Sequence, residues 1–177
     1  MSDQPDAPRV SSLAELLAVA YQVEVDAVER YRMLAEQMDT HNNAELAAVF
    51  RDLARAEGIH AAEIQRWAGD VDVAALGGQF GQWTTGDSPE AADLSSAHYM
   101  MTHSDALRMA LAGEERALAF FEEVVRTVDD PKAKELAKRL VEEEKEHVEL
   151  CHQLIRRHDK PLRRLGNEDP DAPEPQG

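Results

Sequence analysis

Two Glu-x-x-His motifs place metal-binding side chains three residues apart, at Glu57/His60 and at Glu144/His147. Side chains at this spacing are neighbours on one face of an α-helix, so the carboxylate and the imidazole of each pair can reach the same metal ions. Carboxylate and imidazole ligands suit iron, manganese and, less selectively, zinc. A single motif of this kind is weak evidence, so the surrounding sequence has to decide its meaning.

Four stretches of the chain repeat apolar residues in steps of three and four, the periodicity of a helix with one buried face. Near its middle, each apolar face is interrupted by acidic or imidazole side chains. These are Glu24 in the first stretch, Glu57 and His60 in the second, Glu114 in the third, and Glu144 and His147 in the fourth. A third Glu-x-x-His, Glu149/His152, lies about 140° further around the helix than the second, and we assign it to the surface.

Four carboxylates in one layer of a helix bundle need compensating positive charge. An uncompensated buried ion costs several kcal/mol even after the protein relaxes. That cost disfavours the alternative, a bundle whose buried polar residues pair only with one another. Two divalent cations cancel four negative charges, and one Glu from each of two helices with Glu-x-x-His from the other two is the pattern of di-iron and di-manganese bundles. We therefore predict a site for two metal ions per chain, with iron and manganese both compatible with the pattern.

The two halves of the chain follow the same pattern. A glutamate, a small residue and an aromatic residue recur with the same spacing at Glu24, Ala27 and Tyr31 and at Glu114, Ala117 and Phe121. A Glu-x-x-His motif follows in each half, 33 residues after Glu24 and 30 residues after Glu114. The repeat predicts two helical hairpins related by approximate twofold symmetry, which together build the site for two metal ions.

We predict an all-α fold with four helices over residues 12–38, 43–68, 105–128 and 131–157. Ser12 can cap the first helix, with Glu15 three residues on to complete a capping box. Pro131 suits the first position of the fourth helix. The connections 39–42 and 129–130 are short, so each pair of helices is expected to form an antiparallel hairpin.

The segment 69–104 must join the two hairpins. A structureless loop of this length is unusual in a compact domain, whereas a crossover that travels the length of the bundle explains it, with a short helix expected at 91–102. The result is a ferritin-like four-helix bundle over 13–157. We expect a flexible arm at 1–12 and an acidic, proline-rich, disordered tail at 158–177.

Charge and composition exclude several classes of protein. The 177 residues include 19 basic and 35 acidic side chains, a formal net charge of −16, which argues against binding to nucleic acid or to anionic lipid. The single cysteine, Cys151, cannot build a disulfide framework or a four-cysteine iron site. The chain shows no membrane-spanning stretch and no secretory signal, so we expect a cytoplasmic protein.

The motifs resemble those of a known family. E-x-x-A-x-x-x-Y at 24–31, E-x-x-H-A at 57–61, G-E-x-x-A-x-x-F-F at 113–121 and E-E-x-x-H at 143–147 look like the rubrerythrin diiron domain of the ferritin-like superfamily. The resemblance covers residues 13–157. It implies that the iron ligands are Glu24, Glu57, His60, Glu114, Glu144 and His147. It also implies an oxidoreductase that reduces hydrogen peroxide and protects the cell from oxidants.

The chain departs from that family in two respects. Rubrerythrins commonly carry a rubredoxin domain, which one cysteine cannot build, so electrons must come from a separate donor such as a rubredoxin-like protein or a flavoprotein. They also commonly place a further glutamate where this chain has Ala117. The remaining set of six ligands is similar to that of bacterioferritin, but a haem would need Met where this chain has Gly58.

Several assignments remain open at the level of sequence. Tyr31 is the best candidate to donate a hydrogen bond to a carboxylate, although it could also be an ordinary core aromatic with a satisfied hydroxyl group. The roles of Cys151 and of the crossover histidines, His98 and His103, are not assigned. We expect a homodimer. The alternative functions are a ferroxidase that stores iron, with dioxygen as oxidant, a diiron hydroxylase, a manganese catalase and a metal-stabilised binding module.

Overall fold

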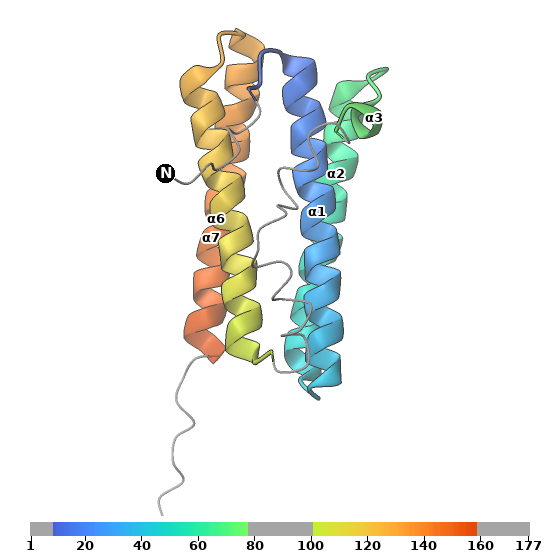
Figure 1. The fold of residues 1–177 in the computed structure, drawn as a ribbon, viewed down its shortest axis with the longest axis vertical. Coiled ribbons are helices and arrows are strands. Elements are labelled where there is room, and N and C mark those ends of the chain that lie inside the picture. Colours follow the sequence, from blue (N-terminus) through green and yellow to red (C-terminus); the bar gives the residue numbers. More distant parts are fainter. Residues whose placement is uncertain (1–8, 78–100, 159–177) are drawn as a thin grey trace, which may run out of the picture.

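Four long helices form the bundle in the computed structural model, which describes residues 9–77 and 101–158. In chain order the helices are α1 (Leu13–Thr40), α2 (Ala44–Ala68), the short α3 (Val73–Gly77), α6 (His103–Thr127) and α7 (Pro131–His158). α1 pairs with α2, and α6 pairs with α7, as two antiparallel hairpins (Figure 1). The fold is the predicted all-α, ferritin-like four-helix bundle.

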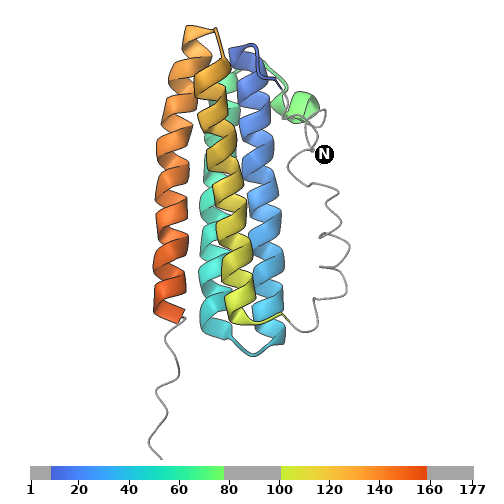
Figure 2. The same ribbon diagram turned by 60° about the vertical axis from the view of Figure 1, so that its left-hand side comes forward.

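The two hairpins are joined between opposite ends of the bundle. α3 lies beside the end at which α2 finishes, whereas α6 begins at the other end, next to the turn between α1 and α2 (Figures 1 and 2). The sequence did not suggest α3, whose Val73 is fully buried against the bundle. Of the short helix expected at 91–102, residues 91–100 lie outside the described chain, and Thr102 instead caps α6.

Local side-chain contacts fix where the helices begin. The Ser12 hydroxyl accepts the backbone N–H of Glu15 at 3.3 Å, as expected of an N-cap. The Glu15 carboxylate, however, accepts the backbone N–H of Ser11 rather than that of Ser12, at 2.7 Å, so the predicted capping box is displaced by one residue. A full capping box, which the sequence analysis missed, starts α6 through Thr102 and Asp105.

The structure describes only a small part of the predicted N-terminal arm and C-terminal tail. Residues 1–8 of the expected arm and 159–177 of the expected tail lie outside the described residues. Val10 is buried against the apolar core, with 8% of its surface exposed. The last stretch of the arm therefore packs on the bundle. No helix in residues 9–77 or 101–158 is long and apolar enough to cross a membrane.

The apolar core consists of two clusters, one on each side of a polar layer. One cluster includes Leu16, Phe121 and Leu140, and the other includes Tyr31 and Phe50. Along every long helix, the sequence passes from one cluster to the other at a glutamate. We call this set the glutamate layer, and its members are Glu24, Glu57, Glu114 and Glu144.

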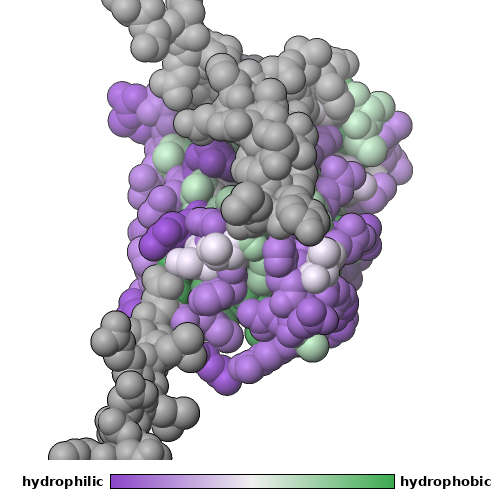
Figure 3. All heavy atoms as spheres, turned by 60° about the horizontal axis from the view of Figure 1, so that its bottom comes forward, coloured by the Kyte–Doolittle hydropathy of each residue, from purple (hydrophilic) through white to green (hydrophobic). Residues whose placement is uncertain are grey.

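Polar side chains cover most of the outside of the bundle. Seen from the end at which α1 turns into α2, the described residues present a mainly hydrophilic surface with small apolar patches (Figure 3). Trp67 fits the buried face of α2 by its spacing, but 43% of its surface is exposed. The Arg139 guanidinium instead lies over its ring, 4.9 Å from the ring centroid, on the outside of the bundle.

Asp130 links the starts of α1 and α7, and its loss should destabilise the whole bundle. Its carboxylate accepts the backbone N–H of Leu13 at 3.1 Å and of Lys132 at 2.9 Å, so one side chain satisfies unpaired donors of two helices. We expect Asp130→Ala to lower the thermal unfolding midpoint by about 3 °C. The control is the exposed neighbour, Asp129→Ala. Equal midpoints for the two variants in a calorimetric scan would contradict the assignment.

Candidate metal centre

The structure brings the six predicted ligands together in the middle of the bundle. The four members of the glutamate layer are the buried charged residues of the described chain, with 1–3% of their surface exposed. His60 and His147 stand beside them with parallel imidazole rings, whose centroids are 5.3 Å apart and whose planes differ by 4°. Both histidines turn Nδ1 toward the carboxylates.

Glu57 lies between the two histidines. Its Oε2 is 3.3 Å from Nδ1 of His60, and its Oε1 is 3.6 Å from Nδ1 of His147. Glu24 completes the His60 side, with its Oε2 3.8 Å from the same Nδ1. Glu57 therefore has one oxygen near each histidine and could ligate an ion beside either of them.

A second candidate metal position lies around His147. Its Nδ1 lies 3.5 Å from Glu114 Oε2 and 3.6 Å from Glu144 Oε2. One ligand atom each from Glu114, Glu144 and His147 lies within 4.8 Å of the others, and the same holds for Glu57, His60 and His147. The two groups overlap at His147, which fits a pair of neighbouring ions rather than two separate sites.

Several buried atoms of these side chains lack hydrogen-bond partners among the described residues. They are Oε2 of Glu57, Nδ1 of His60, Oε2 of Glu144 and Nδ1 of His147. A buried polar atom without a partner costs about 1–3 kcal/mol. These are oxygen and imidazole donors of the kinds that divalent iron and manganese accept. Coordination of two such ions would satisfy all four atoms, so the residues present fit the predicted metals.

Protons and basic side chains balance the carboxylates of the protein without metal. Burial and the neighbouring Glu57 carboxylate raise the pKa of Glu24 well above its usual value, and burial raises the pKa of Glu144 to about 7. Burial opposes protonation of His147, but the adjacent carboxylates of Glu114 and Glu144 outweigh it and raise its pKa to about 11. Without added cations, the layer therefore cannot keep all four carboxylates ionised.

Tyr31 donates the hydrogen bond that its sequence position suggested. Its hydroxyl lies 2.6 Å from Oε1 of Glu114, across the bundle from its own helix. Arg30, which the sequence analysis missed, donates to the same oxygen from Nη2 at 2.9 Å. Burial of Glu114 disfavours its charged form, but His147, Arg30 and Tyr31 together lower its pKa to about 2.

Cys151 lies beside this network without joining the glutamate layer. Its Sγ is 3.8 Å from the Tyr31 hydroxyl, and burial raises the pKa of the thiol to about 11. The thiol is therefore a small buried group next to Tyr31 and not a reactive thiolate. Of the crossover histidines, His103 is the first residue of α6, and His98 lies outside the described residues.

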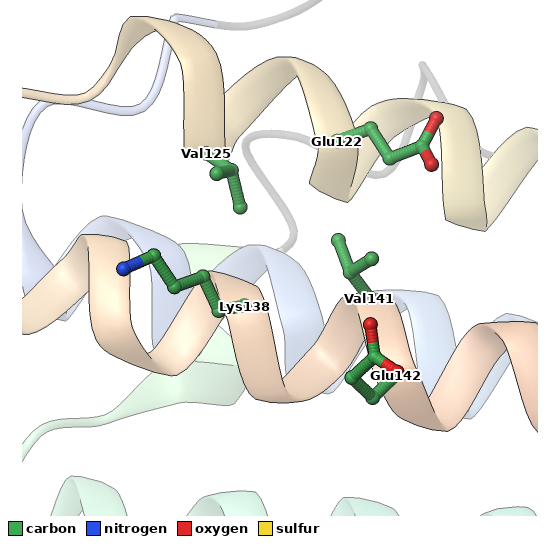
Figure 4. A pocket seen from close by; sticks show the side chains of 5 residues that line it. All are labelled: Glu122, Val125, Lys138, Val141 and Glu142. Carbon is green, nitrogen blue, oxygen red and sulfur yellow. The ribbon is translucent and has the colours of Figure 1, made fainter.

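Other groups of side chains that could bind a metal ion lie apart from the site. Glu149 pairs with Arg156 on the exposed side of α7, at 2.8 Å, as expected for the third Glu-x-x-His motif. A shallow outer groove between α6 and α7 is lined by Glu122, Val125, Lys138, Val141 and Glu142 (Figure 4). Lys138 and Glu142 form ion pairs with neighbours on α7, and the groove contains no histidine. We assign no metal site to it.

Comparison with known proteins identifies the family of the chain. The model of the family described as Rubrerythrin matches residues 15–155, which is most of the chain. The chain belongs to the rubrerythrin family. It is also similar to an uncharacterised conserved protein from Magnetospirillum magnetotacticum MS-1 of known crystal structure, with 36% sequence identity and a TM-score of 0.71 over 85% of this chain and 97% of that one. No protein with a curated description shows significant similarity to the chain.

In this rubrerythrin-family chain, the same helix carries a buried Glu-x-x-His motif, Glu144/His147, and a surface one, Glu149/His152. Comparison of the two allows a controlled test of the candidate ligands. We expect the double variant Glu144→Gln/His147→Gln to bind at most one iron ion per chain, because it removes ligands of the second position. The surface variant Glu149→Gln/His152→Gln has the same composition and should bind two ions, as the wild type should. Metal analysis after anaerobic loading with Fe(II) and desalting measures the difference. Equal metal content in the two variants would contradict the ligand assignment.

Tyr31 should contribute to stability even without metal, because its hydrogen bond is buried and meets a charged acceptor. We expect Tyr31→Phe to lower the free energy of unfolding of the metal-free protein by about 2 kcal/mol in urea. Tyr21→Phe, on the same helix and outside the network, should change it by less than about 0.5 kcal/mol. Similar losses in the two variants would show that the Tyr31 hydroxyl does not hold Glu114.

Proposed function

We propose that this protein is a non-haem diiron oxidoreductase that reduces hydrogen peroxide with electrons from a separate donor. One observation carries the proposal: four buried carboxylates and two imidazoles face one another in a single layer, and four of their polar atoms have no hydrogen-bond partner among the described residues. Membership of the rubrerythrin family supports the same chemistry. The reaction takes two electrons and two protons for each peroxide and forms two water molecules.

The side chains of the site can perform distinct tasks in this reaction. Iron bound between the carboxylates would supply the electrons, because each ion can change oxidation state. Glu57, which lies near both histidines, would ligate the metal together with them. Tyr31 fixes Glu114, and the apolar clusters on both sides of the layer keep bulk water away from it.

The histidine side of the site is the more open one. The side chain of His60 is 29% exposed and that of His147 is 18% exposed, whereas those of the glutamates are only 2–3% exposed. A reactant therefore reaches the layer most easily past the two imidazole rings, between α2 and α7. Only parts of the two imidazole side chains are exposed, and the carboxylates behind them are buried, which favours small oxidants such as peroxide and dioxygen over bulky organic substrates.

The proposal also includes an electron donor and an oligomeric state. The single cysteine of the chain cannot form a four-cysteine iron site, so we assign the reductant role to a rubredoxin-like protein or a flavoprotein. We expect the chain to act as a homodimer in the cytoplasm, with hydrogen peroxide as substrate and a role in oxidative stress. Manganese would fit the same ligands.

A ferroxidase is the second candidate, and the charge of the protein favours it. The net charge of −16 attracts Fe²⁺ to the protein surface, which an iron-storage subunit would use. In that case dioxygen would be the oxidant, and many chains would have to assemble into a cage. A particle the size of a dimer, measured by light scattering, would exclude storage of a mineral core.

The choice of oxidant separates the two candidates. We expect anaerobic protein loaded with two Fe(II) per chain to be oxidised by hydrogen peroxide orders of magnitude faster than by dioxygen, as followed by stopped-flow absorbance. The double variant Glu144→Gln/His147→Gln is the control and should lose the rapid phase of oxidation by peroxide, because it binds at most one ion per chain and no pair of bound ions supplies two electrons together. Oxidation by dioxygen at the same rate would contradict the peroxidase proposal and favour a ferroxidase or an oxygenase.

A further inference from the structure

Glu114 differs from the other members of the glutamate layer in the number of donors on one oxygen. Its Oε1 accepts both the Tyr31 hydroxyl at 2.6 Å and Arg30 Nη2 at 2.9 Å. Two strong donors occupy the lone pairs of that oxygen. Only Oε2 then remains for a metal ion, and this is the oxygen that faces Nδ1 of His147 at 3.5 Å.

The internal repeat shows that the two halves are not equivalent here. Arg30 and Tyr31 follow Glu24 by six and seven residues, and the residues at the same distance from Glu114 are Phe120 and Phe121. A phenylalanine side chain has no hydrogen-bond donor. Among the described residues, Glu24 therefore has no counterpart of the two donors that hold Oε1 of Glu114.

Gly113 makes room for the guanidinium of Arg30. A Cβ atom on Gly113 would collide with Cζ of Arg30 and would lie 2.6 Å from its Nε, far closer than real side chains approach. The guanidinium also lies 5.4 Å from the centroid of the Tyr31 ring. Its position is thus set from three sides, by Glu114, by the Tyr31 ring and by the bare backbone of α6.

We propose that Arg30 is a positioning residue that makes the two metal positions unequal. It restricts Glu114 to coordination through Oε2, and its fixed positive charge lowers the affinity for a cation beside Glu114 and His147. Among the residues that the structure describes, no such charge lies beside Glu24 and His60, so that position fills first. This inference rests on the proposed two-metal site but not on the identity of the oxidant.

The test is a titration with Co²⁺ alone, followed by calorimetry and by the visible absorption of the bound ion. Wild-type protein should bind two ions in separate steps. In Arg30→Gln, which keeps a polar side chain and removes the charge, the weaker step should tighten at least about tenfold, while the stronger step changes little. Arg30→Lys keeps the charge and should keep the two steps apart.

A second variant tests the role of Arg30 without changing Arg30 itself. Gly113→Ala displaces the guanidinium and should bring the two steps together as Arg30→Gln does. Gly58→Ala is its control, because Gly58 also adjoins a ligand glutamate but an added Cβ there meets nothing nearer than Val28 at 3.9 Å. Arg32→Gln, an exposed arginine on the same helix, controls for the net charge.

The outcomes separate this inference from the proposed function. Two binding steps that stay within about threefold of wild type in both Arg30→Gln and Gly113→Ala would overturn the role of Arg30 and leave the two-metal site intact. Two equal steps in the wild type would do the same. Fewer than two bound ions in the wild type would instead overturn the two-metal site itself. Circular dichroism of each variant checks that it is folded before the titration.

Discussion

Burial of four carboxylates in a single layer is the constraint on which the rest of this structure depends. A domain is stable by only about 5–15 kcal/mol, and each uncompensated buried ion costs several kcal/mol, so the layer needs positive charge. The protein supplies part of it through Arg30 at Glu114 and through His147 among three carboxylates. Two divalent cations would supply the rest, in exchange for the protons that the metal-free layer retains.

The helices serve this layer by holding its members from both sides. The apolar clusters above and below fix all four helices, and Asp130 joins the starts of α1 and α7. The two hairpins give the site a nearly symmetric set of candidate ligands. The surroundings are less symmetric, because Arg30 and Tyr31 hold Glu114 where the other half offers Phe120 and Phe121. We infer that symmetry sets where the ions bind, and its local loss sets how tightly each is held.

Much of this arrangement could be predicted, because a polar residue at a buried position stands out against helical periodicity. Tyr31 was recognised for the same reason, since it lies two turns from Glu24 on one face. Arg30 was missed because it lies one position off that face and reaches Glu114 only through its long side chain. Trp67 has the spacing of a core residue, but the end of the bundle leaves it exposed. Periodicity predicts the direction in which a side chain points. It predicts neither how far the side chain extends nor how deeply it is buried.

Anomalous diffraction at the iron edge, from crystals grown after anaerobic loading with Fe(II), would show whether the glutamate layer binds two iron ions. We expect two peaks inside the layer, one beside Nδ1 of His60 and one beside Nδ1 of His147, with Glu57 between them. We also expect Glu114 to meet its ion through Oε2 while Tyr31 and Arg30 keep Oε1. A layer without iron, or iron only at surface carboxylates, would show instead that the four buried glutamates are neutralised by protons and by the protein's own basic side chains.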